Sequence, residues 1–405
     1  MTKSKEDDDK ELYQFVASMP KVELHAHLNG CIREETLFDL ARQKNVELPA
    51  KLFSLDHHTN NDDHVNSFMY NVKPRSLTDC FDMFAVIPKC VNDLASLERI
   101  TREALQDFAN HHVAYLELRS TPKRINQSLS KRQYVETILR VMKEFQEVEE
   151  ERYQQQSTST SSTETTTRLP MKCRFLVSID RSGSVHEAQE NADLAIEFSQ
   201  QPNSLVVGMD IGGNPTKNDF TDFKPALSRA RKAGLKTTVH CGEVPVAAGP
   251  DDTDPRLAKA RDEVLAIFEF RPDRLGHALL LPESLRNELT TLQVPVESCP
   301  TSNVMTLELA KHMGGDLIHG LRQHPQLQYW LDDNYPISIG TDDPGVFNTD
   351  ATQELVLLAK AQEGVTTETL KRIVLDSVNH AFCNVELKDQ MKQLMGEFFA
   401  TMEQV

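Results

Sequence analysis

Short apolar runs alternate with longer amphipathic segments through most of the chain. Eight runs have the length of buried strands, and they cover residues 22–25, 113–119, 174–179, 205–211, 236–240, 274–277, 294–298 and 337–341. Apolar residues recur at helical spacing between these runs, over residues 94–108, 134–145, 188–198, 223–233 and 264–270. Strands that alternate with helices form parallel sheets, so eight such units predict an α/β fold, a (β/α)8 barrel of the TIM type.

Some segments lie outside this simple repeat. Residues 31–112 separate the first two predicted strands. We expect this segment to contain extra helices and a polar patch at 57–63, and to cover the barrel mouth. The C-terminal region carries further helical stripes that would cover the outside of the barrel. Residues 154–167 are mostly Gln, Ser and Thr, which bury little, so we expect a disordered insertion at about 150–169. One barrel domain would span residues 1–405.

Charge and cysteine content narrow the expected partners and compartment. The chain has 44 basic and 61 acidic residues, a net charge of −17, whereas nucleic acids and anionic membranes attract clustered Lys and Arg. We therefore expect neither as a partner. The first eleven residues are polar, no apolar run is long enough to span a membrane, and seven cysteines lack any C-x-x-C spacing. These features predict a cytoplasmic monomer with reduced thiols.

Ionisable side chains gather where the predicted strands end. His25 and His27 close the first strand two residues apart, so both side chains point to the same face. The fifth, sixth and eighth strands end in the same way, at His240 and Glu243, at His277, and at Asp342 and Asp343. Each residue has a structural alternative, such as a helix cap, a first-turn acid or a buried core histidine. Their shared position favours function, because barrel enzymes build active sites at the C-terminal ends of their strands.

These residue types suit a metal ion. Three imidazoles and one carboxylate are typical ligands of Zn²⁺, which lowers the pKa of a bound water toward neutrality. A second ion would need a bridging group such as a modified lysine on the fourth strand, and residues 206–211 contain no lysine. The sequence therefore predicts one zinc ion per chain.

Four spaced motifs resemble those of the adenosine/AMP deaminase family. They are His-Ala-His-Leu-Asn-Gly at 25–30, His-Cys-Gly-Glu at 240–243, Arg-Leu-Gly-His-Ala at 274–278 and Thr-Asp-Asp-Pro-Gly-Val-Phe at 341–347. The resemblance covers most of residues 19–385. It implies that zinc is held by His25, His27, His240 and Asp342, that Asp343 positions the attacking water, that Glu243 protonates N1 of a purine, that His277 orients the hydroxide, and that Gly213 lies against the base.

Within this family, the chain is most similar to the adenosine deaminase-like branch, the N6-methyl-AMP deaminases. The resemblance implies hydrolysis of N6-methyl-AMP to IMP and methylamine. It places His27 and Asp343 beside the substrate and implies nucleotide contacts by Asn29, Ser120, Thr121, Pro122, Lys123 and Asp180. One position departs from the pattern, because Pro88 stands where the branch often has a histidine and supplies no side-chain donor.

Two other functions remain open from the sequence. A plain adenosine deaminase would act on the free nucleoside, and the phosphate contact expected of Lys123 distinguishes the two enzymes. A non-catalytic zinc-binding barrel is disfavoured, because Glu243 and His277 are both present although zinc binding alone does not require them.

Overall fold

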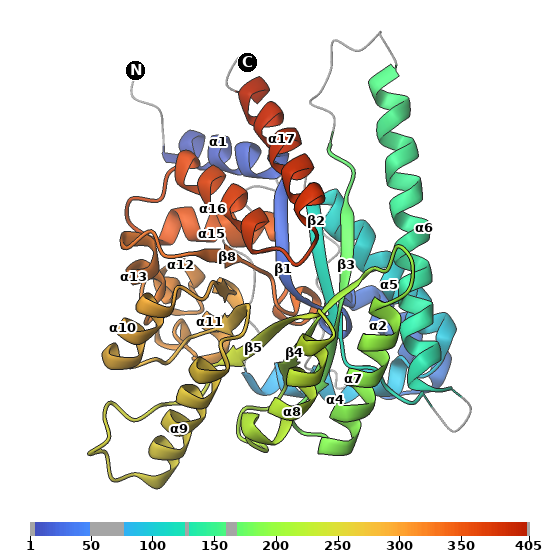
Figure 1. Cartoon of the computed structure of the whole chain (residues 1–405). Coiled ribbons are helices and arrows are strands. Elements are labelled where there is room, and N and C mark those ends of the chain that lie inside the picture. The colour runs from blue at the N-terminus through green and yellow to red at the C-terminus, as the bar shows by residue number, and fades with distance from the viewer. Residues whose placement is uncertain (1–4, 49–76, 126–128, 159–167, 403–405) are drawn as a thin grey trace.

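A barrel of eight parallel strands forms the centre of the molecule (Figure 1). The computed structural model describes residues 5–48, 77–125, 129–158 and 168–402. The strands follow one another in sequence order: β1 (Lys21–His27), β2 (Val113–Ser120), β3 (Lys172–Asp180), β4 (Val206–Gly212), β5 (Lys236–Cys241), β6 (Arg274–His277), β7 (Val296–Ser298) and β8 (Ile337–Ile339). All eight predicted strands are confirmed, and only β7 and β8 are clearly shorter than expected.

The barrel closes between β8 and β1 through the residues that follow β8. The backbone N–H of Asp342 donates to the carbonyl of His25 at 2.8 Å, and the N–H of His27 donates to the carbonyl of Asp342 at 2.9 Å. These two bonds form a parallel bridge between Ala26 and Asp342. The chain end of the eighth unit therefore lies directly beside the first.

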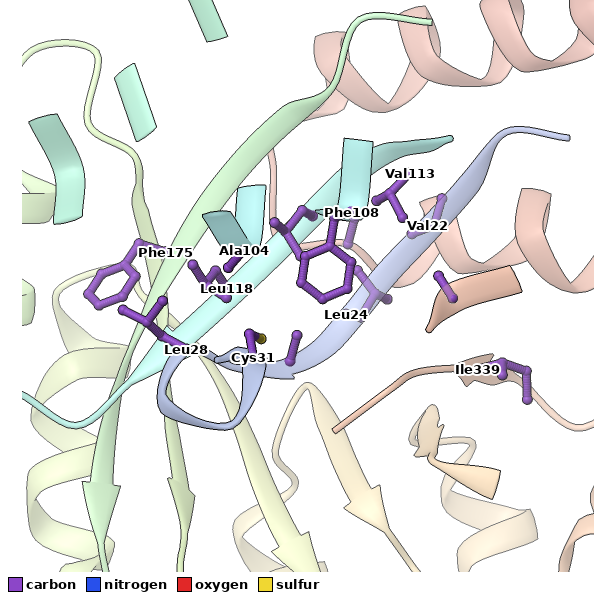
Figure 2. Packing of buried hydrophobic residues seen from close by; sticks show 14 of the residues in the cluster. Val22, Leu24, Leu28, Cys31, Ala104, Phe108, Val113, Leu118, Phe175 and Ile339 are labelled. Carbon is purple, nitrogen blue, oxygen red and sulfur yellow. The ribbon is translucent and has the colours of Figure 1, made fainter. Parts of the chain in front are cut away.

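The two faces of β1 show how the barrel positions polar groups. Val22 and Leu24 are buried on the outer face, where they lie near Phe108 of α5 (Leu94–Asn110), as Figure 2 shows. Successive side chains of a strand point to opposite faces, so the residues that alternate with Val22 and Leu24 face the barrel interior. His25 is one of these and is fully buried. The apolar packing outside thus fixes the direction of the polar side chains inside.

Helices surround the barrel and also fill the long connection between β1 and β2. That connection contains the short 3-10 helix η1 (Leu28–Cys31) followed by α2 (Glu34–Lys44), α4 (Leu77–Cys90) and α5. The helices between later strands are α6 (Lys131–Thr158), α7 (Val185–Ser199), α8 (Phe220–Lys232), α9 (Pro255–Phe270), α10 (Glu283–Leu292), α11 (Pro300–Thr306), η3 (Lys311–Met313), α12 (Leu317–Leu321) and α13 (Leu327–Asp332). The expected helical insertion after the first strand is confirmed, whereas the polar patch at 57–63 lies outside the described residues.

The terminal regions are helical as well. Helix α1 (Lys5–Ser18) precedes β1, and the C-terminal region forms α14 (Pro344–Phe347), α15 (Ala351–Ala361), α16 (Thr367–His380) and α17 (Val385–Met402). Figure 1 shows α1 and α17 at the end of the barrel where β1 begins. No helix in the described part of the chain is long and apolar enough to cross a membrane. All seven cysteines are buried and none of them forms a disulfide bond, as expected.

The first part of the expected disordered insertion is helical. Helix α6 continues to Thr158, so the expectation of disorder from about residue 150 is wrong for its first part. Ion pairs hold this stretch to the segment that enters β3, because Arg168 binds Glu149 at 2.7 Å and Lys172 binds Glu150 at 2.5 Å. Residues 159–167 lie outside the described residues.

Close backbone packing between η1 and α14 makes a prediction about stability. A Cβ atom added to Gly345 would lie 2.1 Å from the carbonyl oxygen of Ile32, whereas one added to Gly249 meets nothing within 4 Å. We expect Gly345→Ala to lower the free energy of unfolding by about 1–3 kcal/mol, the usual scale of overpacking. The control Gly249→Ala should change it by no more than about 0.5 kcal/mol. Urea unfolding measures both, and equal stabilities would contradict the described packing.

Candidate active site

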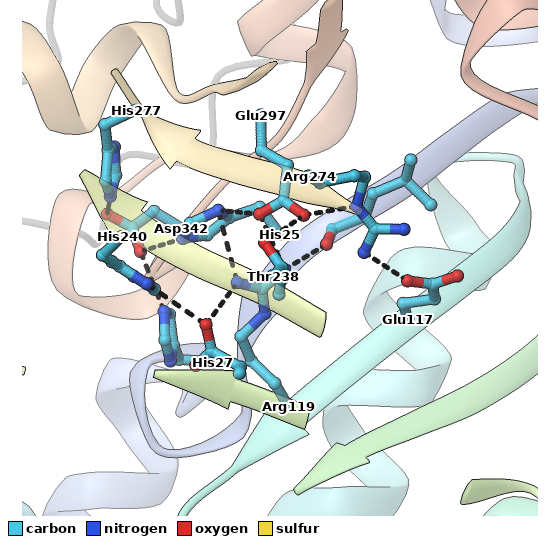
Figure 3. A network of polar contacts seen from close by, with 12 residues as sticks. His25, His27, Glu117, Arg119, Thr238, His240, Arg274, His277, Glu297 and Asp342 are labelled. Carbon is cyan, nitrogen blue, oxygen red and sulfur yellow. Dashed lines mark hydrogen bonds and ion pairs between the residues drawn. The ribbon is translucent and has the colours of Figure 1, made fainter. Parts of the chain in front are cut away.

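Four histidines and an aspartate meet where the strands end, at the mouth of the barrel (Figure 3). His25 and His27 come from β1, His240 from β5 and His277 from β6, and Asp342 follows β8. The ring of His25 lies 4.8 Å from those of His240 and His277 and 5.3 Å from that of His27, measured between centroids. The expected convergence of strand ends therefore exists, although residues far apart in sequence supply it.

One group of described side chains that could hold a metal ion differs in one member from the predicted ligand set. One ligand atom from each of His25, His240, His277 and Asp342 lies within 4.8 Å of the other three. His27 is outside this group, yet its Nε2 is 3.4 Å from Oδ1 of Asp342, as close as Nε2 of His25 at 3.3 Å. The structure thus brings together all four predicted ligands and adds His277 as a neighbour.

Hydrogen bonds on the far side of each ring orient the histidines. Nδ1 of His25 faces Glu297 at 2.6 Å, and Nδ1 of His277 faces Asn303 at 3.1 Å. Nδ1 of His240 lies 2.8 Å from the carbonyl of Ile211. In each ring Nε2 therefore remains for the site, and Nε2 of His25 is buried without an aligned hydrogen-bond partner among the described residues. This donor set fits a metal ion, because metal-binding histidines usually use their second nitrogen in this way.

Burial sets the charge of these side chains. It lowers the pKa of His27 and of His277 to about 3, which keeps both imidazoles neutral, the form that binds metals. Burial also disfavours the charged form of His240, but the nearby carboxylate of Asp210 raises the pKa of that histidine to about 9. A metal ion at His240 would take the place of this proton.

The backbone at the site adopts uncommon conformations. His277 and Asp342 have φ angles of 61° and 60°, in the left-handed region that residues other than glycine seldom enter. Such strain concentrates at functional sites, where the surrounding structure holds it in place. It turns both side chains at the point where their strands end.

Asp343 and Glu243 are the two carboxyl groups beside the cluster. Burial and the charge of Asp342 raise the pKa of Asp343 well above its usual range, and burial raises the pKa of Glu243. Oε1 of Glu243 lies 3.9 Å from Nε2 of His277, and Oε2 is buried without a hydrogen-bond partner in the described structure. Each carboxyl can therefore hold or accept a proton next to the histidine cluster.

The residues expected to contact a nucleotide form two groups. Ser120 and Asn29 lie on either side of the buried Tyr134, whose hydroxyl is 2.8 Å from Oγ of Ser120 and hydrogen bonds to the side chain of Asn29. The second group is more exposed. There the carboxylate of Asp180 lies near Lys123, and its negative charge favours the charged form of the lysine. A Cβ added to Gly213 would lie 2.6 Å from Oδ1 of Asp180.

The loop after β2 supplies the remaining residues of that expectation. Thr121 is half-buried and Pro122 is buried, both between Ser120 and the exposed Lys123. Pro88, the position that departs from the family pattern, is exposed in the last turn of α4.

Sequence reasoning missed a second layer of charged residues inside the barrel. These side chains are fully or almost fully buried, and they are Glu23, Glu117, Arg119, Asp210, Arg274 and Glu297. Glu297 binds His25, Arg119 and Arg274, and Arg274 also binds Glu117 at 2.5 Å. A charged residue within a strand that is apolar on its other face is the signal that could have revealed them, because such a side chain must point into the barrel.

The fold and this cluster define a metal-dependent hydrolase of the barrel class. The chain matches the adenosine deaminase family over residues 20–397 and belongs to that family. It is 32% identical over 387 residues to an N6-mAMP deaminase of Arabidopsis thaliana, which covers 94% of this chain and 97% of the relative. The human N6-methyl-AMP deaminase is 29% identical, with 94% of this chain and 93% of that protein covered.

Solved structures agree with the sequence relatives. Arabidopsis ADAL in complex with IMP superposes with a TM-score of 0.73 and 32% identity, covering 97% of this chain and 100% of the other. The protein is therefore a hydrolytic deaminase with the barrel of its family, as the sequence predicted.

Proposed function

We propose that this chain hydrolyses N6-methyl-AMP to IMP and methylamine. The observation that carries the proposal is the carboxyl of Glu243, whose pKa is raised by burial. Its Oε1 lies 3.9 Å from Nε2 of His277, and its Oε2 is buried without a hydrogen-bond partner in the described structure. The relatives named N6-methyl-AMP deaminases and the IMP complex of Arabidopsis ADAL support the substrate. IMP is the product that this reaction would give.

The proposed metal is a single zinc ion held by His25, His27, His240 and Asp342. Imidazole and carboxylate ligands suit Zn²⁺, and His277 is then left to face Glu243. When bound, zinc lowers the pKa of a coordinated water toward neutrality and so supplies the nucleophile at neutral pH. Strand β4 contains no lysine that could bridge a second ion.

The chain's own side chains would manage the protons. Asp343 positions the attacking water and, in its ionised form, accepts a proton from it, and Nε2 of His277 orients that water toward C6 of the purine. Attack at C6 places electron density on N1, and Glu243 donates a proton there. The proton held by Asp343 then passes to the amine, which leaves as methylamine, and the C6 hydroxyl returns a proton to Glu243, so one water is consumed for each IMP formed.

The nucleotide would be held by the groups at the barrel mouth. Asn29 and Ser120 are joined through Tyr134, and the adjacent loop carries Thr121, Pro122 and Lys123 toward the phosphate. Asp180 lies beside Gly213. Because glycine has no Cβ atom, a flat base can approach its backbone. A lysine about 4 Å from a phosphate gains roughly 4 kcal/mol at an effective dielectric of about 20, whereas distant acidic charges are screened by salt.

One chain supplies every group of this site, so a monomer would be a complete catalyst. The seven free buried thiols favour a reducing compartment such as the cytoplasm.

The metal assignment predicts which histidine the ion needs. Purified protein should contain about one zinc per chain by mass spectrometry of the metal, because these four side chains would surround one ion and β4 has no lysine to bridge a second. His27→Ala and the pair His240→Ala with Asp342→Ala should lose most of it, and His277→Ala should retain it. The control His186→Ala removes an exposed histidine of α7 and should have no effect. Metal loss in His277→Ala but not in His27→Ala would assign the ion to the group formed by His25, His240, His277 and Asp342.

The proton donor can be separated from the fold. Glu243→Gln keeps the size of the side chain, so zinc content and thermal midpoint should remain while kcat falls by at least about 100-fold. Glu269→Gln, an exposed change on α9, serves as the control. Turnover close to that of the wild type in Glu243→Gln would reject the proposed role.

The phosphate contact predicts a change in specificity. Lys123→Ala should reduce kcat/KM for N6-methyl-AMP by about tenfold or more, and leave any slow turnover of adenosine unchanged, since adenosine has no phosphate. Lys236→Ala is the control, because it removes an equal charge at the start of β5, the opposite end of the barrel. If Lys123→Ala slows nucleotide and nucleoside equally, the free-nucleoside alternative is favoured.

A further inference from the structure

Two of the proposed metal ligands each rest on a buried carboxylate. Nδ1 of His25 lies 2.6 Å from Oε2 of Glu297 on β7, and Nδ1 of His240 lies 3.2 Å from Oδ1 of Asp210 on β4. Both carboxylates are completely buried. The carboxylate of Glu297 therefore orients the ring of His25. The carboxylate of Asp210 orients the ring of His240 together with the carbonyl of Ile211, which lies 2.8 Å from the same nitrogen.

A single guanidinium connects these two carboxylates. Arg119 on β2 is fully buried, and its Nη1 binds Oδ1 of Asp210 at 3.1 Å while its Nη2 binds Oε2 of Glu297 at 2.9 Å. Nη2 also donates to the carbonyl of Leu24, next to His25. The bonded oxygens are the same two that face the histidine rings, so the contacts run without a break from His25 to His240 (Figure 3).

The chemistry of the link depends on the shape of arginine. A guanidinium holds its donors in one rigid plane, so two carboxylates bound to its two terminal nitrogens have a fixed separation and direction. A lysine ammonium carries the same charge but no such fork. Charge neutralisation and geometric coupling are therefore separable properties at this position.

We propose that Arg119 is a positioning residue that couples the orientations of His25 and His240 through Glu297 and Asp210, and so preorganises the metal site. The inference rests on the proposed metal site and extends it to a residue that touches neither metal nor substrate. A disturbance of either carboxylate is then transmitted to both histidines, because both acids share one rigid donor group.

Arg274 provides a matched comparison within the same network. It is also fully buried and also binds Glu297, at 2.5 Å through Nε, but to the other carboxylate oxygen, Oε1. Its second ion-pair partner is Glu117, and it forms no ion pair with Asp210 among the described residues. Arg274 thus neutralises buried charge without joining the two carboxylates that hold the histidines.

The test compares zinc affinity in Arg119→Lys and Arg274→Lys, measured by competition with a chromophoric chelator. Loss of an outer partner of metal ligands typically weakens metal binding by about 10–100-fold, and we expect Arg119→Lys to fall in this range. The loss of zinc affinity in Arg274→Lys should be at least about fivefold smaller. Urea unfolding of the two metal-free variants should nevertheless show a similar loss of stability. The visible absorption spectrum of the Co²⁺-loaded proteins should shift in Arg119→Lys, because it reports ligand geometry.

A second set of variants keeps the inference testable if Arg119→Lys does not fold. Asp210→Asn and Glu297→Gln preserve side-chain size, and their double variant completes a cycle for zinc affinity. Coupling through Arg119 predicts that the double variant loses clearly less affinity than the product of the two single losses. The inference about Arg119 would be overturned if the double variant lost zinc affinity by the product of the two single losses, within about twofold. Equal losses of zinc affinity in Arg119→Lys and Arg274→Lys would also overturn it. Neither result would contradict the proposed function. A wild-type chain that binds no zinc would overturn the proposed function as well.

Discussion

The pairing of charges inside the barrel is the constraint on which the rest of the structure depends. Arg119, Arg274, Glu117, Asp210 and Glu297 are all completely buried. A buried charge without a partner is strongly destabilising, and removal of one member of such a pair typically costs about 3–5 kcal/mol. The network can exist only because the closed barrel directs side chains from β2, β4, β6 and β7 into one interior, where each carboxylate meets a guanidinium.

This arrangement explains why the histidines stand at one end of the network. Hydrocarbon side chains of similar volume are often as stabilising as buried ion pairs, so stability alone gives little reason to keep the charges. Their contacts with His25 and His240 give a functional reason, because they fix the ring nitrogens that point to the site. The same network reaches the C-terminal region, where Arg274 donates to the carbonyl of His380 at 2.7 Å. Helix α16 is thereby tied to the barrel interior.

The sequence predicted the features that depend on local periodicity. Eight strands, the helical insertion after the first strand and the convergence of strand-end residues follow from alternation and from the geometry of parallel barrels. The continuation of α6 to Thr158 could not be predicted from its polar composition, because ion pairs to residues distant in sequence, such as Lys172, support that stretch. Tertiary contacts of this kind leave no periodic pattern.

Residues of the site divide in the same way. His25, His240 and Asp342 belong to recognisable sequence motifs, and the structure brings them together. The place of His277 in the group that could hold a metal ion, and the roles of Arg119 and Glu297, depend on side-chain directions across the barrel, which no spacing within one strand reveals. The left-handed backbone at His277 shows why, since it redirects a side chain at the end of a strand.

Our central proposal is that the chain is a deaminase of a purine nucleotide with a small N6 substituent. Its most direct test is to incubate the purified protein separately with N6-methyl-AMP, AMP and adenosine, and to quantify IMP or inosine by chromatography, with chelator-treated protein as the blank. The account predicts that N6-methyl-AMP is converted fastest, with one methylamine released for each IMP. Faster conversion of adenosine than of both nucleotides, or no conversion of any of the three by metal-loaded protein, would contradict it.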